Sequence, residues 1–186
     1  MTRKPTLIAI GGLSGSGKST LARALAAERS ARLLRSDVAR KSLFGVAETT
    51  RLAPDAYRPE ITETVYQQLI AHAAAALAGR ADVIVDAVFQ RPAERAAFET
   101  AAANGKATFI GLWLDTDVAT RRARVADRSA DASDATPAIV DQQDTRDPGP
   151  ITWHRIAASG TAEAVLSAAR TLIAETESSG SASDLC

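Results

Sequence analysis

Short apolar runs alternate with helical patterns along most of this chain. Runs typical of buried strands lie at residues 6–10, 31–35, 83–86, 107–114 and 151–157. Apolar residues recur at helical spacing in two longer segments, at Ile61, Val65, Leu69, Ala73 and Leu77 and at Val165, Leu166, Ala169, Leu172 and Ile173. Strands that alternate with helices predict an α/β fold with a parallel sheet and right-handed crossovers.

Local signals mark the ends of several predicted elements. Pro92 fits the first turn of a helix that Asn104-Gly105 would close, and residues 18–28 have the pattern of another helix. Near the C-terminus the residues become small and polar, and such residues bury too little apolar surface to become ordered. We therefore predict a single domain over residues 1–176 and a flexible tail over residues 177–186.

The composition limits the classes of function. The chain has 186 residues, and 22 Lys and Arg balance 22 Asp and Glu, so the formal net charge is zero. This balance disfavours a nucleic-acid partner or attraction to an anionic membrane. There is no signal-peptide pattern and no apolar run that could span a bilayer, and the one cysteine is Cys186, so we expect a cytoplasmic protein. The oligomeric state stays open.

The most specific motif is G-L-S-G-S-G-K-S at residues 12–19, which matches the phosphate-binding loop pattern G-x-x-x-x-G-K-[ST]. Glycines let backbone N–H groups approach a phosphate, Lys18 reaches the β- and γ-phosphates, and the Ser19 hydroxyl binds Mg²⁺. The motif lies between a predicted strand and a predicted helix, which argues against a flexible Gly/Ser turn. The residues predicted to bind the nucleotide are Gly12, Ser14, Gly15, Ser16, Gly17, Lys18, Ser19 and Thr20.

Polar side chains follow the second and third predicted strands, at the sheet edge where active groups gather in such folds. Asp37 and Arg40 lie one helical turn apart, so Asp37 could accept a proton from a substrate hydroxyl while Arg40 holds the acceptor. Asp37 could instead only cap a helix. Asp86 ends the third strand like a Walker B aspartate that contacts Mg²⁺ or its water, although it could also touch the acceptor or cap a turn.

Arginines follow the fourth predicted strand, on a helix that Asp115-Thr116-Asp117 would begin. Behind them comes a small, acidic segment that ends at Pro137, and we predict a lid near residues 129–137. Arg124 and Arg128 lie four residues apart and could neutralise charge on a transferring phosphoryl group. The alternative for each is a solvated helix charge.

These motifs together resemble the P-loop kinases of the group known as predicted AAA-type ATP-binding kinases, over residues 6 to about 174. That group is similar to zeta toxins, chloramphenicol phosphotransferase and the kinase domain of phage polynucleotide kinase. The resemblance rests on residues 12–20, 36–40, 57–60, 83–89 and 124–128, the last followed by residues 131–133. It implies a three-layer P-loop NTPase fold with a five-stranded parallel sheet in the order 2-3-1-4-5.

The resemblance also implies roles for single residues. In polynucleotide kinases a D-x-x-R pair acts as general base and acceptor clamp, which maps onto Asp37 and Arg40. A lid arginine maps onto Arg124 or Arg128, and an adenine pocket would lie near Ser159-Gly160. The group usually has D-A-T-F after the third strand, whereas this chain has Asp86-Ala87-Val88-Phe89 and lacks that hydroxyl.

The sequence therefore predicts an ATP- and magnesium-dependent kinase that phosphorylates a hydroxyl of a small molecule, such as a sugar, nucleoside, antibiotic or nucleotide sugar. The other class considered is a regulatory ATPase without a small acceptor; a switch GTPase would need an N-K-x-D motif, which does not occur. A toxin-like kinase acting on a nucleotide sugar is a third possibility, without any recognisable antitoxin-binding feature. Residues 45–60 are the segment most suited to reading the acceptor, but they have no regular pattern. The two histidines, His72 and His154, have no partner at metal-ligand spacing and are interpreted as core or surface residues.

Overall fold

The sheet has five parallel strands and is the centre of the molecule. A computed structural model describes residues 4–127 and 132–183 of the chain. The strands are β1 (Thr6–Gly11), β2 (Arg32–Arg35), β3 (Val83–Asp86), β4 (Thr108–Asp115) and β5 (His154–Ala157). They pair in the order β2-β3-β1-β4-β5, all parallel, which confirms the predicted strand order.

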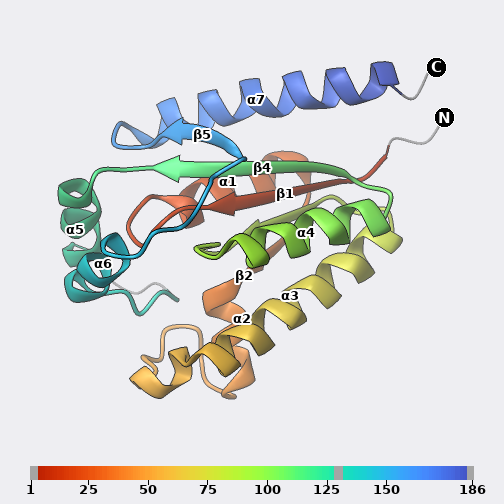
Figure 1. Ribbon diagram of the computed structural model, residues 1–186. Coiled ribbons are helices and arrows are strands. Elements are labelled where there is room, and N and C mark those ends of the chain that lie inside the picture. The colour runs from red at the N-terminus through yellow and green to blue at the C-terminus, as the bar shows by residue number, and fades with distance from the viewer. Residues whose placement is uncertain (1–3, 128–131, 184–186) are drawn as a thin grey trace.

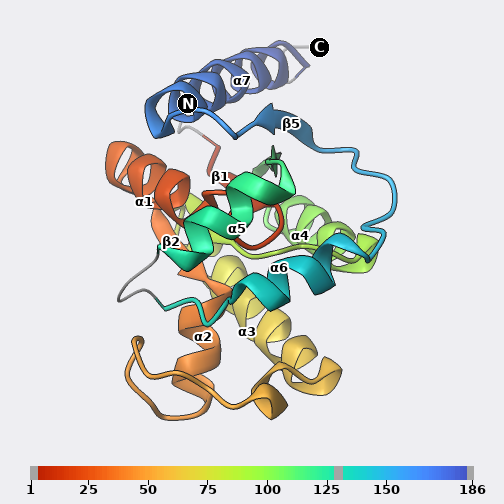
Figure 2. The ribbon, with the colours of Figure 1, turned by 90° about the vertical axis from the view of Figure 1, so that its left-hand side faces the viewer.

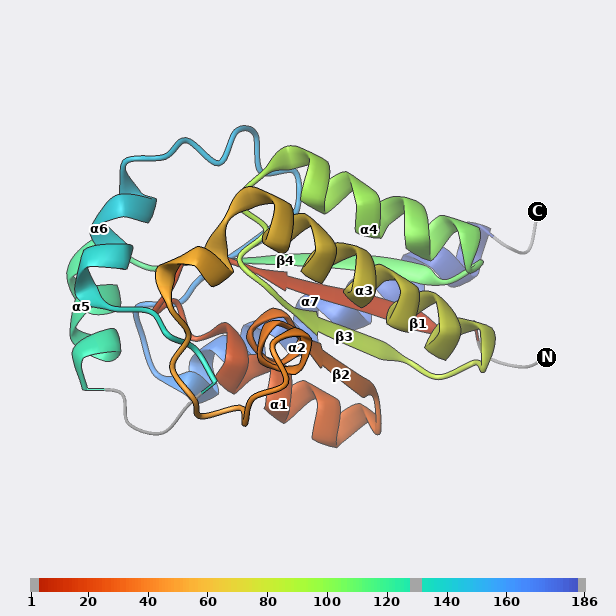
Figure 3. The same cartoon turned by 90° about the horizontal axis from the view of Figure 1, so that it is seen from below.

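Helices cover both faces of the sheet, so the fold has three layers (Figure 1). One face packs against α1 (Lys18–Arg29) and α7 (Ala162–Ser183), and the other against α3 (Pro59–Ala78) and α4 (Pro92–Asn104). Figure 3 shows α3 and α4 lying across the second face. Each face has its own buried cluster, because the central strand β1 points Leu7 and Ala9 to one side and Ile8 and Ile10 to the other.

The two tryptophans explain why two strand positions are glycines. Trp113 and Trp153 are buried in the cluster under α3 and α4. A Cβ at Gly111 would collide with the Trp153 indole, and one at Gly11 would lie 2.9 Å from Cε3 of Trp113. The indole of Trp153 donates to a carboxylate oxygen of Glu99 at 2.7 Å, which satisfies its buried N–H. The sheet is therefore held closely against α4.

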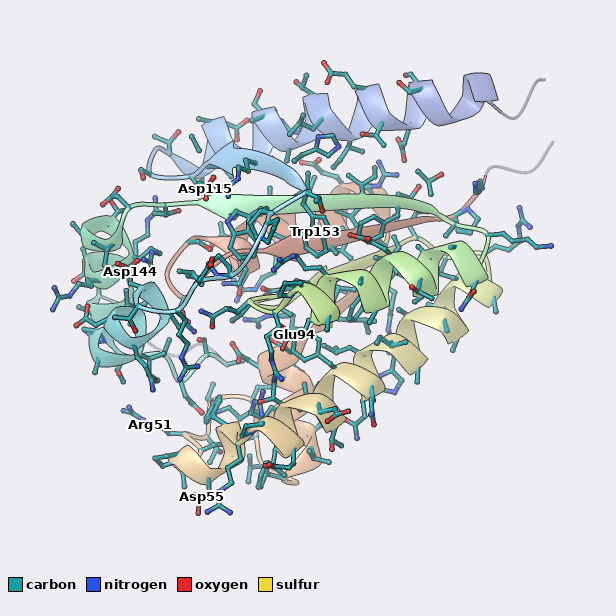
Figure 4. All side chains as sticks on the ribbon, in the orientation of Figure 1. Arg51, Asp55, Glu94, Asp115, Asp144 and Trp153 are labelled. Carbon is teal, nitrogen blue, oxygen red and sulfur yellow. The ribbon has the colours of Figure 1, made fainter. Side chains whose placement is uncertain are left out.

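The remaining helices lie at the end of the sheet toward which the strands point. They are α2 (Ser36–Leu43), the 3₁₀ helix η1 (Pro54–Tyr57), α5 (Val118–Ala126) and α6 (Pro137–Asp144). Figure 2 looks onto this end, with α5 and α6 in front of the sheet. Figure 4 shows Asp115 and Asp144 at the same end. The phosphate-binding motif and Asp86 lie here too, because both directly follow strands.

The last helix extends beyond its predicted end. Residue 177, where the sequence predicts a tail to begin, lies inside α7, which runs to Ser183. The Glu177 carboxylate accepts hydrogen bonds from Arg29 on α1 and from the Thr6 hydroxyl, at 3.1 Å for the latter. These contacts join α7 to β1 and α1 at the position where the tail was predicted to begin. Within residues 4–127 and 132–183, no helix is long and apolar enough to cross a membrane.

Candidate active site

The phosphate-binding motif forms the turn from β1 into α1, as predicted. Gly15 and Gly17 have positive φ angles of 83° and 98°, and Gly17 is the N-cap of α1. A Cβ at Gly15 would collide with the backbone carbonyl of Arg121 on α5, so this position requires glycine. The Lys18 ammonium reaches back across the turn to the Leu13 carbonyl at 3.1 Å. The loop therefore has the backbone shape and the central cation that bind phosphates.

Ser19 and Asp86 meet at the loop, although they are 67 residues apart in the sequence. The Ser19 hydroxyl donates to Oδ2 of Asp86 at 2.7 Å, and Asp86 is 5 % exposed. Arg35, at the end of β2, donates from Nε to the same oxygen at 3.2 Å. A serine hydroxyl and one carboxylate beside a phosphate site are a donor set that fits Mg²⁺, which takes its other ligands from phosphates and water.

The loop separates two cavities. The larger has a volume of about 960 Å³ and extends from the loop to α2, α3 and the segment before α6. The smaller, of about 530 Å³, lies between α1, α5 and the start of α7. Gly15, Gly17 and Thr20 line both, and Gly160 lines the smaller one, where the resemblance implies an adenine pocket. A nucleotide with its phosphates on the loop would therefore have one cavity on each side.

Asp37 faces the larger cavity from the first turn of α2. The N-cap of this helix is Arg35, and no side-chain cap bond forms there, so Asp37 is not the capping residue. Burial and then the nearby Asp86 carboxylate raise the pKa of Asp37 above its usual range, against the opposing effects of Lys18 and of a hydrogen bond from Ser133. Asp37 is therefore a carboxylate of raised basicity beside the phosphate loop.

Arg40 lies one turn further along α2 and is only 5 % exposed. Its guanidinium donates to the Ala56 carbonyl at 2.6 Å and to the Thr62 hydroxyl at 3.3 Å, and lies 4.7 Å from the centre of the Tyr57 ring. Its Nε has no hydrogen-bond partner among the described residues, and burial lowers the pKa of Arg40. Arg40 is therefore a buried cation that both lines the cavity and holds η1 against α3.

Asp134 is a functional candidate that the sequence analysis missed. Its carboxylate accepts from Lys41 at 2.7 and 2.8 Å, from the Tyr57 hydroxyl at 2.6 Å and from the Leu52 N–H at 3.0 Å. Lys41 also donates to the Thr50 carbonyl and is 1 % exposed. These bonds join the second half of the predicted lid to the segment between α2 and α3. Nothing in the sequence of this small, acidic segment indicates that one of its aspartates contacts a buried lysine.

Of the two arginines that were predicted to act together, Arg124 and Arg128, the structure describes Arg124. Arg124 lines the smaller cavity and donates to the carbonyls of Ala158 and Gly160 at 2.9 and 3.0 Å. Its guanidinium also approaches the Ser16 carbonyl of the phosphate loop, at 3.5 Å. Arg121 is buried and pairs with Asp144 of α6. Arg128 and residues 129–131 of the predicted lid lie outside the described residues, whereas Ser133, Asp134 and Ala135 line the larger cavity.

The turn after β3 completes the floor of the larger cavity. Phe89 is fully buried with a positive φ of 53°, a conformation that is uncommon for a bulky residue. Its N–H donates to the Tyr66 hydroxyl at 3.0 Å, and its carbonyl accepts from Arg95 at 2.7 Å. Arg95 also holds the carbonyls of Pro148 and Pro150, at 2.8 and 3.0 Å. Several elements thus fix this strained turn, which carries Val88 and Gln90 into the cavity.

The strand order and the phosphate loop, with Asp86 opposite Ser19, define the fold of a P-loop kinase. The chain belongs to the family described as AAA domain, which matches residues 7–148. No curated protein sequence matches it. These findings confirm the resemblance to AAA-type P-loop kinases.

Several solved structures with this fold are kinases of low sequence identity. A gluconokinase from Sinorhizobium meliloti is 19% identical, with a TM-score of 0.65, and the match covers 96% of this chain and 97% of that one. A sugar kinase from Janibacter sp. gives 16% and 0.62, with 92% and 95% covered. The APS kinase of Mycobacterium tuberculosis, in complex with AMPPNP and APS, gives 16% and 0.64, with 92% and 99% covered. The likeness therefore extends over nearly the whole fold.

Proposed function

We propose that this protein is an ATP- and magnesium-dependent kinase that transfers the γ-phosphoryl group to a hydroxyl of a small molecule. The observation that carries the proposal is the position of the phosphate loop between two cavities, with Asp37 in the larger one. A base-sized cavity on one side and a larger cavity on the other suit a donor nucleotide and a separate acceptor. The membership of the AAA domain family and the kinase fold support the same reaction class.

In this mechanism the loop N–H groups and Lys18 bind the β- and γ-phosphates. Ser19 and Asp86 would hold Mg²⁺, which when bound would neutralise charge that develops on the transferring group. Asp37 accepts the proton of the acceptor hydroxyl while the oxygen of that hydroxyl forms a bond to the γ-phosphorus. The bond between the γ-phosphorus and the bridging β-phosphate oxygen breaks, and ADP is released. A carboxylate whose pKa is raised is a better base for this step than an exposed aspartate.

The acceptor would occupy the part of the larger cavity between Arg40, Tyr57 and the turn after β3. Arg40 brings a buried positive charge to this wall, and the groups to which it donates, the Ala56 carbonyl and the Thr62 hydroxyl, are uncharged. A polar or anionic acceptor would compensate the charge. The gluconokinase and sugar kinase among the structural neighbours support placing sugars and sugar acids early in a substrate screen.

The test is a screen of hydroxyl compounds, including sugars, sugar acids, nucleosides, aminoglycosides and nucleotide sugars, for acceptor-dependent release of ADP. We expect at least one compound to accelerate ADP release and to appear as a phosphorylated product by mass spectrometry. With that compound, Asp37→Asn should lower turnover by about 10²-fold or more and leave ATP affinity nearly unchanged.

The matched control is Asp55→Asn, because Asp55 is an exposed aspartate of η1 at the outer edge of the molecule (Figure 4) and does not line the larger cavity. This variant should turn over like the wild type. Wild-type turnover in Asp37→Asn would exclude the general-base role. ATP hydrolysis that responds to no small acceptor, but to a protein partner, would favour the regulatory ATPase instead.

A further inference from the structure

The side chain of Gln143, in the last turn of α6, reaches the phosphate loop. Its Oε1 accepts a hydrogen bond from the backbone N–H of Ser14 at 2.8 Å. Its own backbone carbonyl accepts from Nε2 of Gln90, on the turn after β3, at 3.3 Å. Gln143, Ser14 and Lys18 all line the larger cavity. A side-chain oxygen from α6 thus occupies an N–H of the loop at the face where the acceptor would approach.

The position of this bond indicates which part of a nucleotide it would meet. Ser14 precedes Gly15 and Gly17 and lines only the larger of the two cavities, whereas the loop residue Ser16 lines only the smaller one. A nucleotide that places its base in the smaller cavity therefore brings its terminal phosphate toward Ser14. An anionic oxygen there would compete with Oε1 of Gln143 for the same N–H.

Glutamine is suited to remain in contact after such a competition. Its amide has an acceptor oxygen at one side and two N–H donors at the other, and rotation about its last side-chain bond exchanges the two. With the loop N–H taken by phosphate, the rotated amide can donate to the same phosphate. Glutamate or leucine cannot make this donation, and glutamate would also repel the phosphate.

We propose that Gln143 binds the γ-phosphate and thereby distinguishes the nucleoside triphosphate from the diphosphate. The inference rests on the proposed function for the choice of ATP as ligand. In the triphosphate complex the Gln143 amide donates to a γ-phosphate oxygen, and in its absence Oε1 returns to the Ser14 N–H. No proton or bond is exchanged in this step, which is binding alone.

The contacts at the two ends of α6 connect the proposed bond between Gln143 and the γ-phosphate with the part of the larger cavity where the acceptor would bind. Asp144, the next residue, pairs with the buried Arg121, so the end of α6 is fixed to α5. At its other end α6 begins directly after residues 132–136, which include Asp134 and the Ser133 that bonds to Asp37. A helix that contacts the γ-phosphate at one end thus adjoins the base at the other.

The experiment compares equilibrium binding of AMPPNP and ADP, each with Mg²⁺, by titration calorimetry in the absence of acceptor. The variants are Gln143→Leu and Gln143→Glu, and the control is Gln67→Leu at an exposed position of α3. We expect the affinity for AMPPNP to fall about tenfold or more in both Gln143 variants, since a charge-assisted hydrogen bond is lost. The loss should be larger in Gln143→Glu, because glutamate also repels the phosphate. The affinity for ADP should change by less than about threefold, and the control should match the wild type.

The results separate four outcomes. An AMPPNP-to-ADP affinity ratio that is unchanged in both Gln143 variants would overturn the inference. A parallel loss of affinity for both nucleotides would overturn it as well, because Gln143 would then only support the loop. Failure of the wild type to bind either nucleotide would instead overturn the proposed kinase function. A shifted ratio together with a failed acceptor screen would leave the inference standing and refute the kinase proposal alone.

Discussion

Replacement of Asp134 by alanine should destabilise the protein strongly, because it leaves a buried lysine without its counter-ion. The Lys41 side chain is 1 % exposed, and its ammonium lies 2.7 Å from Oδ1 of Asp134. In Asp134→Ala that ammonium keeps the Thr50 carbonyl but loses the negative charge. Breaking a buried ion pair from one side costs about 3–5 kcal/mol. We expect the free energy of unfolding to fall by about this amount.

Urea denaturation at neutral pH, followed by circular dichroism, measures the change. Lys41→Met should cost a similar amount, whereas the double variant Lys41→Met with Asp134→Leu should recover most of it, because two apolar side chains leave no buried charge. The matched control is Asp55→Ala, which breaks an ion pair with Arg58 whose side chains are 78% and 64% exposed. That variant should lie within about 0.5 kcal/mol of the wild type.

The pH dependence provides a second check on Asp134. Burial by itself would raise its pKa, but hydrogen bonds from Lys41, Tyr57 and Leu52 outweigh this effect and hold the pKa below its usual range. A pKa that is lower in the folded state contributes stability above the unfolded value of about 4, and this contribution is lost as the pH falls through the folded value. The difference between wild type and Asp134→Ala should therefore be constant above about pH 5 and shrink below pH 4. A variant within 1 kcal/mol of the wild type at neutral pH, or a difference that widens in acid, would refute the reasoning.

Three further predictions concern the nucleotide and the base. Lys18→Ala should keep the fold but weaken ATP binding and abolish turnover, because a point charge on the phosphates is removed; unchanged titration and turnover would exclude the loop from the site. Arg124→Ala should weaken the binding of ATP and ADP equally and should affect kcat less than it affects binding, because Arg124 lies at the smaller cavity. A selective loss of kcat would show that Arg124 acts on the transferring phosphoryl group instead. Because the pKa of Asp37 is raised, kcat/KM should rise with pH through a value above that of a free aspartate, and the residual activity of Asp37→Asn should lack this step.

The alternation of apolar runs and helical patterns was enough to predict the sheet, because the central strands β1 and β3 are short, mainly apolar segments buried on both faces. The strand order came from the family resemblance, and the structure has the same order. Boundaries were predicted well where a residue has a local backbone effect, as Pro92 and Asn104 do at the ends of α4. The end of α7 was not predicted well, because the contacts of Glu177 with α1 and β1 join residues that are far apart in the sequence.

The site divides in the same way. The phosphate loop and its contact with Asp86 follow from the sequence, because a motif with fixed spacing specifies the loop and the end of a parallel strand brings Asp86 to it. Gln143 contacts Ser14, which lies 129 positions earlier in the sequence, and Asp134 contacts Lys41, which lies 93 positions earlier. No spacing rule connects residues so far apart. Glutamine and aspartate are common on solvated surfaces, so their residue type alone signals nothing. Only the packing of α6 and its preceding segment over the end of the sheet makes these side chains part of the site.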